Sequence, residues 1–442
     1  MDNLKQKFKE KAIVLFEENK TMLKEHGDMV VDKIQVRQMF GGMRGMKSMI
    51  WETSELDAYE GIRFRGYSIR QLRKALPKAE GCKEPLPEGL FWLMLVGEIP
   101  TAREVKWLTD EWNKRSDVPD HTFKMLDSMP TDTHPMTQFS AAILSMQTDS
   151  VFAKRYAEGI SKKDHWDAYY EDTMNLVASL PRVAAYIYRR SYKNGDHIAP
   201  DPELDWGANF AHMLGVSDNP DFMSLMRLYL TIHADHEGGN ASAHTTHLVG
   251  STLSDPYYSL SAGMNALAGP LHGLATQEVV KWILNMVSEL GTDTPSSDQI
   301  TDYINKTLAE GKVIPGYGHA VLRQPDPRYM AQRVFAEDYI QDDPIVKIVW
   351  KLFDIVPPLL QDLGKVKNPW PNVDAHSGCL LMHYGLKDFS YYTVLFGVSR
   401  AMGVLASGVW SRALGMPLER PKSLTSTAIK QMINKNTATP KE

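Results

Sequence analysis

The chain has 442 residues, of which 43% are hydrophobic and 23% are charged, with a net charge of −5 and a pI near 6.3. This is globular composition, with material for two or three domains, or for one large domain that carries a smaller one. It excludes the overall basic field that binds nucleic acid or an anionic membrane, so an anionic ligand must be met by local arginines.

The cysteines and the first residues bear on the compartment. Cys82 and Cys379 have neither metal-site spacing nor a disulfide framework, which favours a reducing compartment. Residues 1–20 contain no apolar run of signal-peptide length. They are rich in both Lys and Glu, whereas mitochondrial transit peptides are poor in acidic residues. We therefore expect a cytoplasmic protein, with a processed protein of the mitochondrial matrix as the alternative.

The N-terminal third contains a helix, two strand-like patches and a helix start. Apolar residues of an amphipathic helix recur at Leu4, Phe8, Leu15 and Met22. Residues 30–36 and 62–65 have the β-branched and apolar pattern of short strands. Thr101 and Glu104 have the spacing of a capping box, which predicts a helix from there onward.

Helical periodicity dominates the rest of the chain. Helices are predicted from Gly273 onward and over 221–234, 297–309, 327–339, 344–363 and 376–386. No repeat of fixed period separates these segments. The fold class is therefore predicted to be mainly α, with a few short strands near the N-terminus.

Residues 391–410 form an apolar stretch about as long as a bilayer is thick. Arg400 lies in its middle, where a lipid-facing helix would resist a charge, so a fully buried core helix is predicted. A buried guanidinium is costly without an anionic partner. That partner is either a carboxylate of the protein or a bound anionic substrate.

Three segments place a titratable side chain beside a loop or a helix start. His272 lies between Pro270 and Gly273 just before a helix, where the dipole favours a neutral imidazole that can stabilise an enolate; the alternative is a helix cap. His319 closes a loop with two glycines, which lets a ligand approach the backbone, although most such loops are simple turns. Asp374 follows a proline-rich loop and is either a helix N-cap or a general base.

Arginines and a histidine cluster complete the candidates. Arg328, Arg400 and Arg420 stand in apolar or proline-bound contexts, and three guanidinium forks suit a dicarboxylate, although each alone could form a structural ion pair. Residues 233–247 contain two His-x-x-His pairs but not the His-Glu-x-x-His spacing of a zinc site. We expect no metal there, but a polar segment that presents one histidine to substrate.

Long, ordered segments carry a family resemblance. They include GGMRGMKS, EGIRFRGYSI, PLPEGLFWLMLVGEIPT, HADHEGGNASAHTTHLVGS, LAGPLHGLATQEV, VIPGYGHAVLR, KNPWPNVDAHSG and YYTVLFGVSRAMGV. Over about residues 30–425 the chain resembles citrate synthases of the type found in mitochondria and some bacteria. The resemblance implies a mainly-α homodimer. It also implies a large domain, residues 1–273 and 387–442, with a small domain, residues 274–386, that closes over substrate.

The resemblance also implies a role for each candidate. His272 would hydrogen-bond the acetyl-CoA carbonyl, Asp374 would take the methyl proton, and His319 would polarise the ketone of oxaloacetate. The oxaloacetate-binding residues would be His236, Arg328, Arg400 and Arg420, the last supplied by the partner subunit. Val313, Ile314, Pro315, Gly316, Tyr317 and Gly318 would line the CoA site, with Arg44, Arg323, Lys365 and Lys367 as candidates for its phosphates.

The same resemblance limits the ligands. No cofactor is expected, because the CoA thioester is a substrate, and neither nucleic acid nor a membrane is an expected partner. The alternative is a 2-methylcitrate synthase that uses propionyl-CoA. One extra methylene is worth only about 1–3 kcal/mol of discrimination, so the motifs do not separate the two activities.

Overall fold

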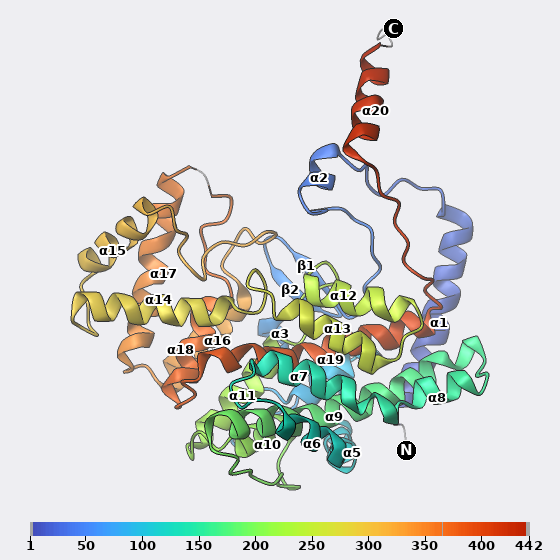
Figure 1. The fold of residues 1–442 in the computed structure, drawn as a ribbon, viewed down its shortest axis with the longest axis horizontal. Helices are drawn as coiled ribbons and strands as arrows, with labels where there is room; N and C mark the ends of the chain where they lie inside the picture. The colour runs from blue at the N-terminus through green and yellow to red at the C-terminus, as the bar shows by residue number, and fades with distance from the viewer. Residues whose placement is uncertain (1–2, 365, 439–442) are drawn as a thin grey trace.

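The computed structural model describes residues 3–364 and 366–438, and within them the fold is mainly helical (Figure 1). The α-helices are α1 (Leu4–His26), α2 (Val36–Phe40), α3 (Ile69–Ala75), α4 (Pro87–Val96), α5 (Ala102–Arg115), α6 (Asp120–Ser128), α7 (Pro135–Ser145), α8 (Val151–Ala157), α9 (His165–Tyr192), α10 (Trp206–Leu214), α11 (Pro220–Ile232), α12 (Ala241–Ser251), α13 (Pro256–Leu267), α14 (Ala275–Leu290), α15 (Ser297–Ala309), α16 (Pro327–Tyr339), α17 (Pro344–Asp362), α18 (Asp374–His383), α19 (Tyr392–Ala413) and α20 (Ser426–Ala438). The 3-10 helices are η1 (Met146–Asp149), η2 (Lys162–Asp164) and η3 (Phe389–Tyr391), and the strands are β1 (Ser54–Asp57), β2 (Gly61–Phe64) and β3 (Tyr67–Ser68).

The three strands form one small antiparallel sheet in the order β1-β2-β3. The prediction of a few short strands near the N-terminus is confirmed, but the strand expected over 30–36 is wrong. Residues 29–35 are irregular and exposed, and α2 begins at Val36. Apolar alternation alone does not make a strand, because its backbone groups need a neighbouring strand to bond with.

The predicted helices are largely confirmed. α15 and α16 begin and end at the predicted residues, and α5 begins with the capping box of Thr101 and Glu104. α18 differs, because it begins two residues before the predicted start and ends at His383. Gly385, two residues later, has φ +101°, a conformation that continues no α-helix.

The helix around Arg400 is confirmed as a core helix. α19 packs against α4, α9, α11, α12 and α13, and nearly all of its side chains are buried. Within the described residues, the stretch Phe389–Ala413 is the one helix long and apolar enough to cross a membrane, and 94% of its most apolar window is buried inside the protein. Burial by other helices explains its apolar character.

The helices α14 to α18 gather at one end of the molecule, coloured yellow to orange in Figure 1. They pack mainly on one another, through α14 on α18, α15 on α17, and α16 and α17 on α18. The remaining long helices surround α9 and α19. Contacts of α14 with α19 and of α16 with α11 join the two groups.

Candidate active site

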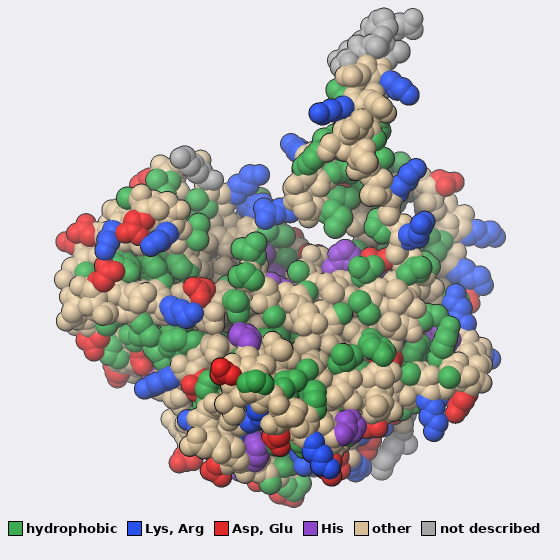
Figure 2. Space-filling view, in the orientation of Figure 1, with side chains coloured by type: hydrophobic (Ala, Val, Ile, Leu, Met, Phe, Trp, Pro, Cys, Tyr) green, Lys and Arg blue, Asp and Glu red, His purple; other side chains and the backbone are tan. Residues whose placement is uncertain are grey.

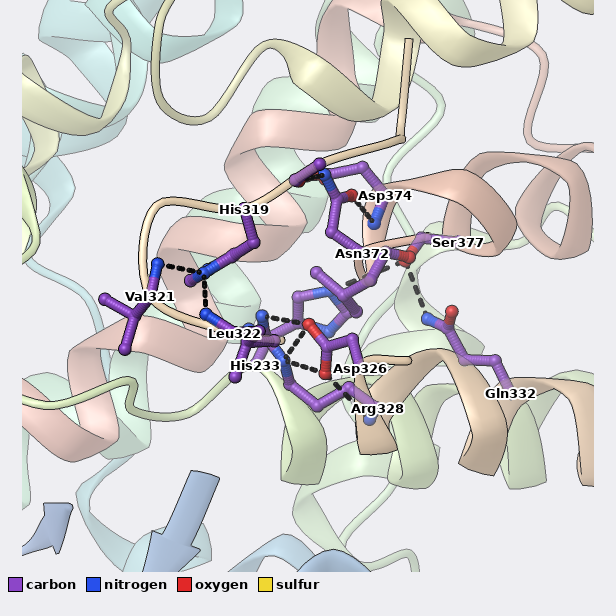
Figure 3. Close-up of polar contacts among 12 residues, drawn as sticks. His233, His319, Val321, Leu322, Asp326, Arg328, Gln332, Asn372, Asp374 and Ser377 are labelled. Carbon is purple, nitrogen blue, oxygen red and sulfur yellow. Dashed lines mark hydrogen bonds and ion pairs between the residues drawn. The ribbon is translucent and has the colours of Figure 1, made fainter. Parts of the chain in front are cut away.

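The loop between α15 and α16 and the loop between α17 and α18 are joined through their backbones. The N–H of Gly318 donates to the carbonyl of Trp370 at 3.0 Å, and the N–H of Asn372 donates to the carbonyl of Gly316 at 2.9 Å. The Asn372 side chain adds a bond to the Gly318 carbonyl at 3.1 Å. These bonds bring His319 and Asp374, which are far apart in the sequence, to the same place (Figure 3).

Gly316 makes this junction possible. Its φ is +79°, and a Cβ atom there would lie 2.8 Å from the Cα of Ala375. No larger residue fits without moving α18. The loop was predicted to let a ligand approach its backbone, and at Gly316 the close neighbour is the first turn of α18.

His319 is held as a neutral hydrogen-bond donor. Its Nδ1 accepts hydrogen bonds from the backbone N–H groups of Val321 and Leu322, at 3.0 and 3.1 Å (Figure 3). Backbone N–H groups can only donate, so the ring proton must lie on Nε2. Burial, together with the charge of Arg328, lowers the pKa of His319 to about 4. Near neutral pH, Nε2–H is therefore a donor on an uncharged ring.

His272 has the opposite tautomer by the same reasoning. It lies before α14, in the turn that follows α13, and no side chain caps α14. The backbone N–H of Ser242 donates to its Nε2 at 3.2 Å, and the Ser242 hydroxyl lies 2.9 Å from the same atom. The proton is therefore on Nδ1. Burial, then the charge of Arg400, lowers the pKa of His272 to about 4. His272 therefore does not cap α14, and its Nδ1–H is free of a hydrogen-bond partner among the described residues.

Asp374 is the first residue of α18, and its side chain does not cap the helix. One carboxylate oxygen, Oδ1, accepts a hydrogen bond from the Thr276 hydroxyl at 2.5 Å. The other, Oδ2, accepts none from the described residues. Burial raises the pKa of Asp374, and the bond from Thr276 and the charge of Arg328 offset this only in part. A carboxylate with a raised pKa is a stronger base than an exposed one.

Arg400 is a buried cation without a carboxylate partner. Its side chain is 1% exposed, and Nη1 donates to Asn240 Oδ1 at 2.9 Å and to Ser242 Oγ at 3.1 Å. Among the described residues it forms no ion pair, although Asp235 contributes a favourable field. Burial lowers its pKa to about 10, so it stays charged. Of the two partners predicted for this guanidinium, a bound anion is the one that remains.

Arg328 is also buried, but it is paired. Asp326 holds its Nε and Nη2 in a fork, with the shortest contact at 2.6 Å (Figure 3). Burial would raise the pKa of Asp326, but this ion pair outweighs it and lowers the pKa. The third nitrogen of Arg328, Nη1, makes no hydrogen bond within the described residues. The pair therefore fixes the guanidinium and leaves one edge open.

His236 lies beside His319. Its ring lies 5.4 Å from that of His319 in an edge-on arrangement, and its Nε2 is buried without a hydrogen-bond partner in the part of the chain described. Burial first, then the charges of Arg328 and Arg400, lower the pKa of His236 well below its ordinary value. A buried polar atom without a partner is rare, and it marks a place where a ligand atom can bind.

Of the other predicted binding residues, Gly316 and Gly318 contact the cluster through the backbone junction described above. Ile314 and Gly316 are buried, Pro315, Tyr317 and Gly318 are half-buried, and Val313, Arg44, Lys367 and Arg420 are exposed. Arg323 uses Nη1 to bond the carbonyls of Val321 and Leu322 in its own loop. Lys365 lies outside the described residues.

Several residues of the site were not predicted. Asn240 and Ser242 join Arg400 to His272, Thr276 holds Asp374, and Asp326 holds Arg328. Asn240 carried a usable signal, since it is the N-cap of α12, a position that fixes an amide side chain. Hydroxyls and amides are common on helices, and only the tertiary contacts select these.

The histidine-rich segment 233–247 separates into different roles. The carboxylate of Asp235 accepts from Trp51, Thr53 and Ser54, so it anchors the segment to the sheet region. No group of three or more His, Cys, Asp or Glu side chains in residues 3–364 and 366–438 is arranged to hold a metal ion. One of its histidines, His236, faces the cluster.

The arrangement has a definite chemical capacity. A carboxylate base stands near two neutral imidazole donors of opposite tautomer, beside two guanidinium groups. Each guanidinium has one nitrogen, Nη1 of Arg328 and Nη2 of Arg400, that forms no hydrogen bond among the described residues. This combination can remove a proton next to a carbonyl, stabilise the resulting enolate, and hold a second, anionic reactant.

Comparisons with known proteins give the chain its relatives. The sequence profile of a family described as "Citrate synthase, C-terminal domain" matches residues 42–422. A protein of Glossina morsitans morsitans named "Probable citrate synthase, mitochondrial" is 57% identical over 417 residues, which cover 94% of this chain and 89% of that one. "Citrate synthase, mitochondrial" of Kajikia audax is 57% identical over 415 residues, 94% of this chain and 88% of that one. The crystal structure of citrate synthase from Pyrobaculum aerophilum has a TM-score of 0.75 at 27% identity, over 87% of this chain and 92% of that one.

Proposed function

The chain belongs to the citrate synthase family, and we propose that its site condenses acetyl-CoA with oxaloacetate and hydrolyses citryl-CoA to citrate and CoA. The observation that supports this most is the pairing of Asp374, whose pKa is raised, with two imidazoles, His272 and His319, that burial keeps neutral. Removing a proton from a thioester methyl group needs a base and a hydrogen-bond donor together. The family needs no cofactor, because the CoA thioester is a substrate.

In the first step, Nδ1–H of His272 bonds the thioester carbonyl while Asp374 takes a methyl proton. The carbonyl oxygen gains negative charge as the proton leaves. The neutral imidazole of His272 stabilises this charge by a hydrogen bond and, being a weak acid, keeps its own proton. The contact of Ser242 with Nε2 keeps the proton on the nitrogen that faces the substrate. A positioned acid–base group typically raises the rate about 10²–10⁴-fold. One preorganised hydrogen-bond donor typically raises it about 10²–10³-fold.

In the second step, the enolate carbon attacks the ketone of oxaloacetate. Nε2–H of His319 bonds the ketone oxygen and makes the carbon more electrophilic. The alkoxide that forms takes up one proton, which balances the methyl proton taken by Asp374, and becomes the hydroxyl of citryl-CoA. Water then cleaves the thioester, and CoA leaves as a thiol. Closure of the site before these steps keeps water from the enolate.

The oxaloacetate carboxylates bind the open edges of Arg328 and Arg400, and His236 adds its unpartnered Nε2. Two cations and a donor around one space match a dicarboxylate with a keto group. Arg420, supplied by the partner subunit, is proposed as a third guanidinium. Its exposure in the segment after α19 supports a role outside its own core.

CoA is proposed to lie along the loop of residues 313–318, where Val313 is 79% exposed. Arg44, Arg323 and Lys367 are candidates for its phosphates, and Lys365 lies outside the described residues. Figure 2 shows Lys and Arg side chains around the hollow between the α14–α18 end and the projection that carries α20. Such a rim attracts a polyanionic ligand.

We propose residues 274–386 as the small domain that closes over the substrates, with residues 1–273 and 387–442 as the large domain. In support, α14 to α18 pack mainly on one another. Asp374 and His319 belong to this group, while His236 and Arg400 belong to the rest. The catalytic groups are therefore divided between the two parts, and closure would assemble them.

The function is tested by release of the CoA thiol. With acetyl-CoA alone, thiol release is expected to be at least about 10³-fold slower than with acetyl-CoA and oxaloacetate together, because oxaloacetate binding must precede closure. Propionyl-CoA is expected to react about 10–200-fold more slowly, the usual cost of one methylene. The relatives are named citrate synthases and do not favour the 2-methylcitrate alternative. Faster release from propionyl-CoA would establish that alternative, and rapid release without oxaloacetate would contradict ordered closure.

Substituting Arg400→Lys is expected to weaken oxaloacetate binding about tenfold or more, while CoA binding changes less than about twofold. Lysine keeps the charge but loses the planar fork that matches a carboxylate. Titration calorimetry with each ligand measures both effects, and Arg70→Lys, at an exposed position of α3, is the control. Equal weakening of both ligands would instead assign Arg400 a purely structural role in α19.

A homodimer is proposed from the surface of the single subunit. Apolar side chains of α1 and of the segment after it are exposed, among them Leu23, Val30 and Phe40. A shallow groove of about 740 Å³ on α1 is lined by Ile13, Val14 and Met22 together with Glu17, Glu18, Thr21, Glu25 and His26. The segment that carries α2, and α20 beyond it, project from the body (Figure 1). Exposed apolar surface of this extent usually lies in an interface.

The compartment is proposed from the relatives. Both curated relatives carry the word "mitochondrial" in their names, and no comparison supports the cytoplasm that the composition of the first residues predicted. We therefore propose the mitochondrial matrix, the alternative named from the sequence. A fraction of the protein in the cytosol of its source cells would contradict this.

A further inference from the structure

The segment between α19 and α20 has a single described anchor. Residues 417–425 have no regular structure, and the side chains on either side of Glu419, those of Leu418 and Arg420, are exposed. Glu419 alone is held, because its backbone N–H donates to Ser251 Oγ at 3.1 Å. Between 417 and 424, no other residue has a hydrogen bond to the rest of the protein in the part described. We call residues 417–424 the strap.

One histidine bonds the Glu419 carboxylate, and a second lies beside it. Nε2 of His244 bonds its Oε2 at 3.0 Å. Nε2 of His247 lies 3.1 Å from Oε1, which has no hydrogen-bond partner in the part of the chain described. The carboxylate is 23% exposed and His247 only 12%, so the contacts are partly shielded from water. Ser411 of α19 lies 3.4 Å from the other nitrogen of His247 and fixes its ring from the far side. Charge-assisted contacts in such a setting are stronger than exposed surface pairs.

The residues that hold Glu419 lie on the helix that also supports the active site. His244, His247 and Ser251 belong to α12, and Ser242, in the first turn of α12, bonds both His272 and Arg400. One short helix therefore fixes the position of the acid–base histidine of its own subunit and of the strap. Arg420 follows Glu419 directly, so its starting point is set by the same helix.

We propose that Glu419 is a positioning residue: held by hydrogen bonds to His244 and Ser251 of α12, it sets the strap so that Arg420 reaches oxaloacetate in the partner subunit. This proposal rests on the proposed function, in which Arg420 binds a substrate carboxylate. Without the anchor, the strap, which has no other described hydrogen bond to the rest of the protein, would sample many positions. Binding of Arg420 to the substrate would then have to fix the strap in one of them, at a cost in conformational entropy. Loss of the anchor should therefore lower the kcat/KM for oxaloacetate and leave the KM for acetyl-CoA nearly unchanged.

The test is a double-mutant cycle of Glu419→Gln and Arg420→Gln, read as kcat/KM for oxaloacetate at saturating acetyl-CoA. Glu419→Gln keeps the shape of the side chain and removes its charge. It is expected to lower this kcat/KM about tenfold, the usual effect of losing a charge-assisted contact, with kcat and the KM for acetyl-CoA changed less than about twofold. In the Arg420→Gln background the same change should have less than about a twofold effect, because the anchor then positions nothing.

The controls separate the possible failures. Glu289→Gln removes an exposed ion pair with Lys306 and should change nothing. His244→Gln weakens the anchor while Glu419 stays, so it should act in the direction of Glu419→Gln even if that variant folds poorly. A full effect of Glu419→Gln in the Arg420→Gln background, or no effect in either, overturns the positioning role. If Arg420→Gln alone leaves oxaloacetate kinetics unchanged, the proposed substrate role of Arg420 is wrong instead.

Discussion

Replacing Asp374 with asparagine should lower kcat by about 10³-fold or more while oxaloacetate still binds with nearly its original affinity. The amide keeps the shape of the carboxyl and can still accept from Thr276, but it cannot take a proton from the thioester methyl group. Loss of a positioned base typically costs about 10²–10⁴-fold. Oxaloacetate binding depends on the arginines and His236, which the substitution does not touch. Single-turnover kinetics and calorimetry with oxaloacetate measure the two quantities separately.

The pH dependence adds an independent check on Asp374. Burial raises its pKa, and only the ionised form is a base, so kcat of the unmodified protein should fall as the pH falls through that raised pKa. His272 and His319, with pKa values lowered to about 4, stay neutral above that pH. The residual activity of the Asp374→Asn variant should therefore lack this acid limb. Asp362→Asn, at an exposed position, is the matched control. A near-normal kcat in the Asp374→Asn variant would remove Asp374 from the role of base.

Mixing two variants of strongly reduced activity should restore activity if the site is shared between subunits. Each site would use Asp374 of one chain and Arg420 of the other. When Asp374→Gly and Arg420→Gln chains are unfolded and refolded together, a mixed dimer has one site with both defects and one site with neither. With random pairing, roughly one site in four should be intact, as follows from the twofold symmetry of such a dimer. The assay is thiol release, with the fraction of mixed dimers determined by native mass spectrometry.

The same mixture can refute the shared site. If Arg420 acts within its own chain, every site in every dimer retains one defect, and no activity returns. Each variant refolded alone provides the baseline, and unmodified protein refolded in parallel gives the yield of refolding. Confirmed mixed dimers without activity would place Arg420 outside the partner's site, and would leave the roles of His272, His319 and Asp374 untouched.

The sequence by itself determined the fold class, the buried helix around Arg400 and the family. Helical periodicity marks which face of each segment is buried, and that pattern is local, so α15 and α16 could be predicted to the residue. Arg400 in an apolar stretch already required an anionic partner. The strand expected over 30–36 was wrong because pairing is not local: the residues had the pattern but no neighbour.

Only the tertiary structure decided the protonation and the partners of the site residues. For His272 and Asp374 the sequence left a helix cap and a catalytic group as alternatives, because both occur at helix starts. The structure gives the donors that fix each tautomer, the backbone N–H groups of Ser242, Val321 and Leu322, and the burial that shifts each pKa. Those donors come from segments distant in the sequence or from loop geometry that glycines permit. A hydrogen bond depends on distance and direction in space, and no residue pattern along the chain specifies either.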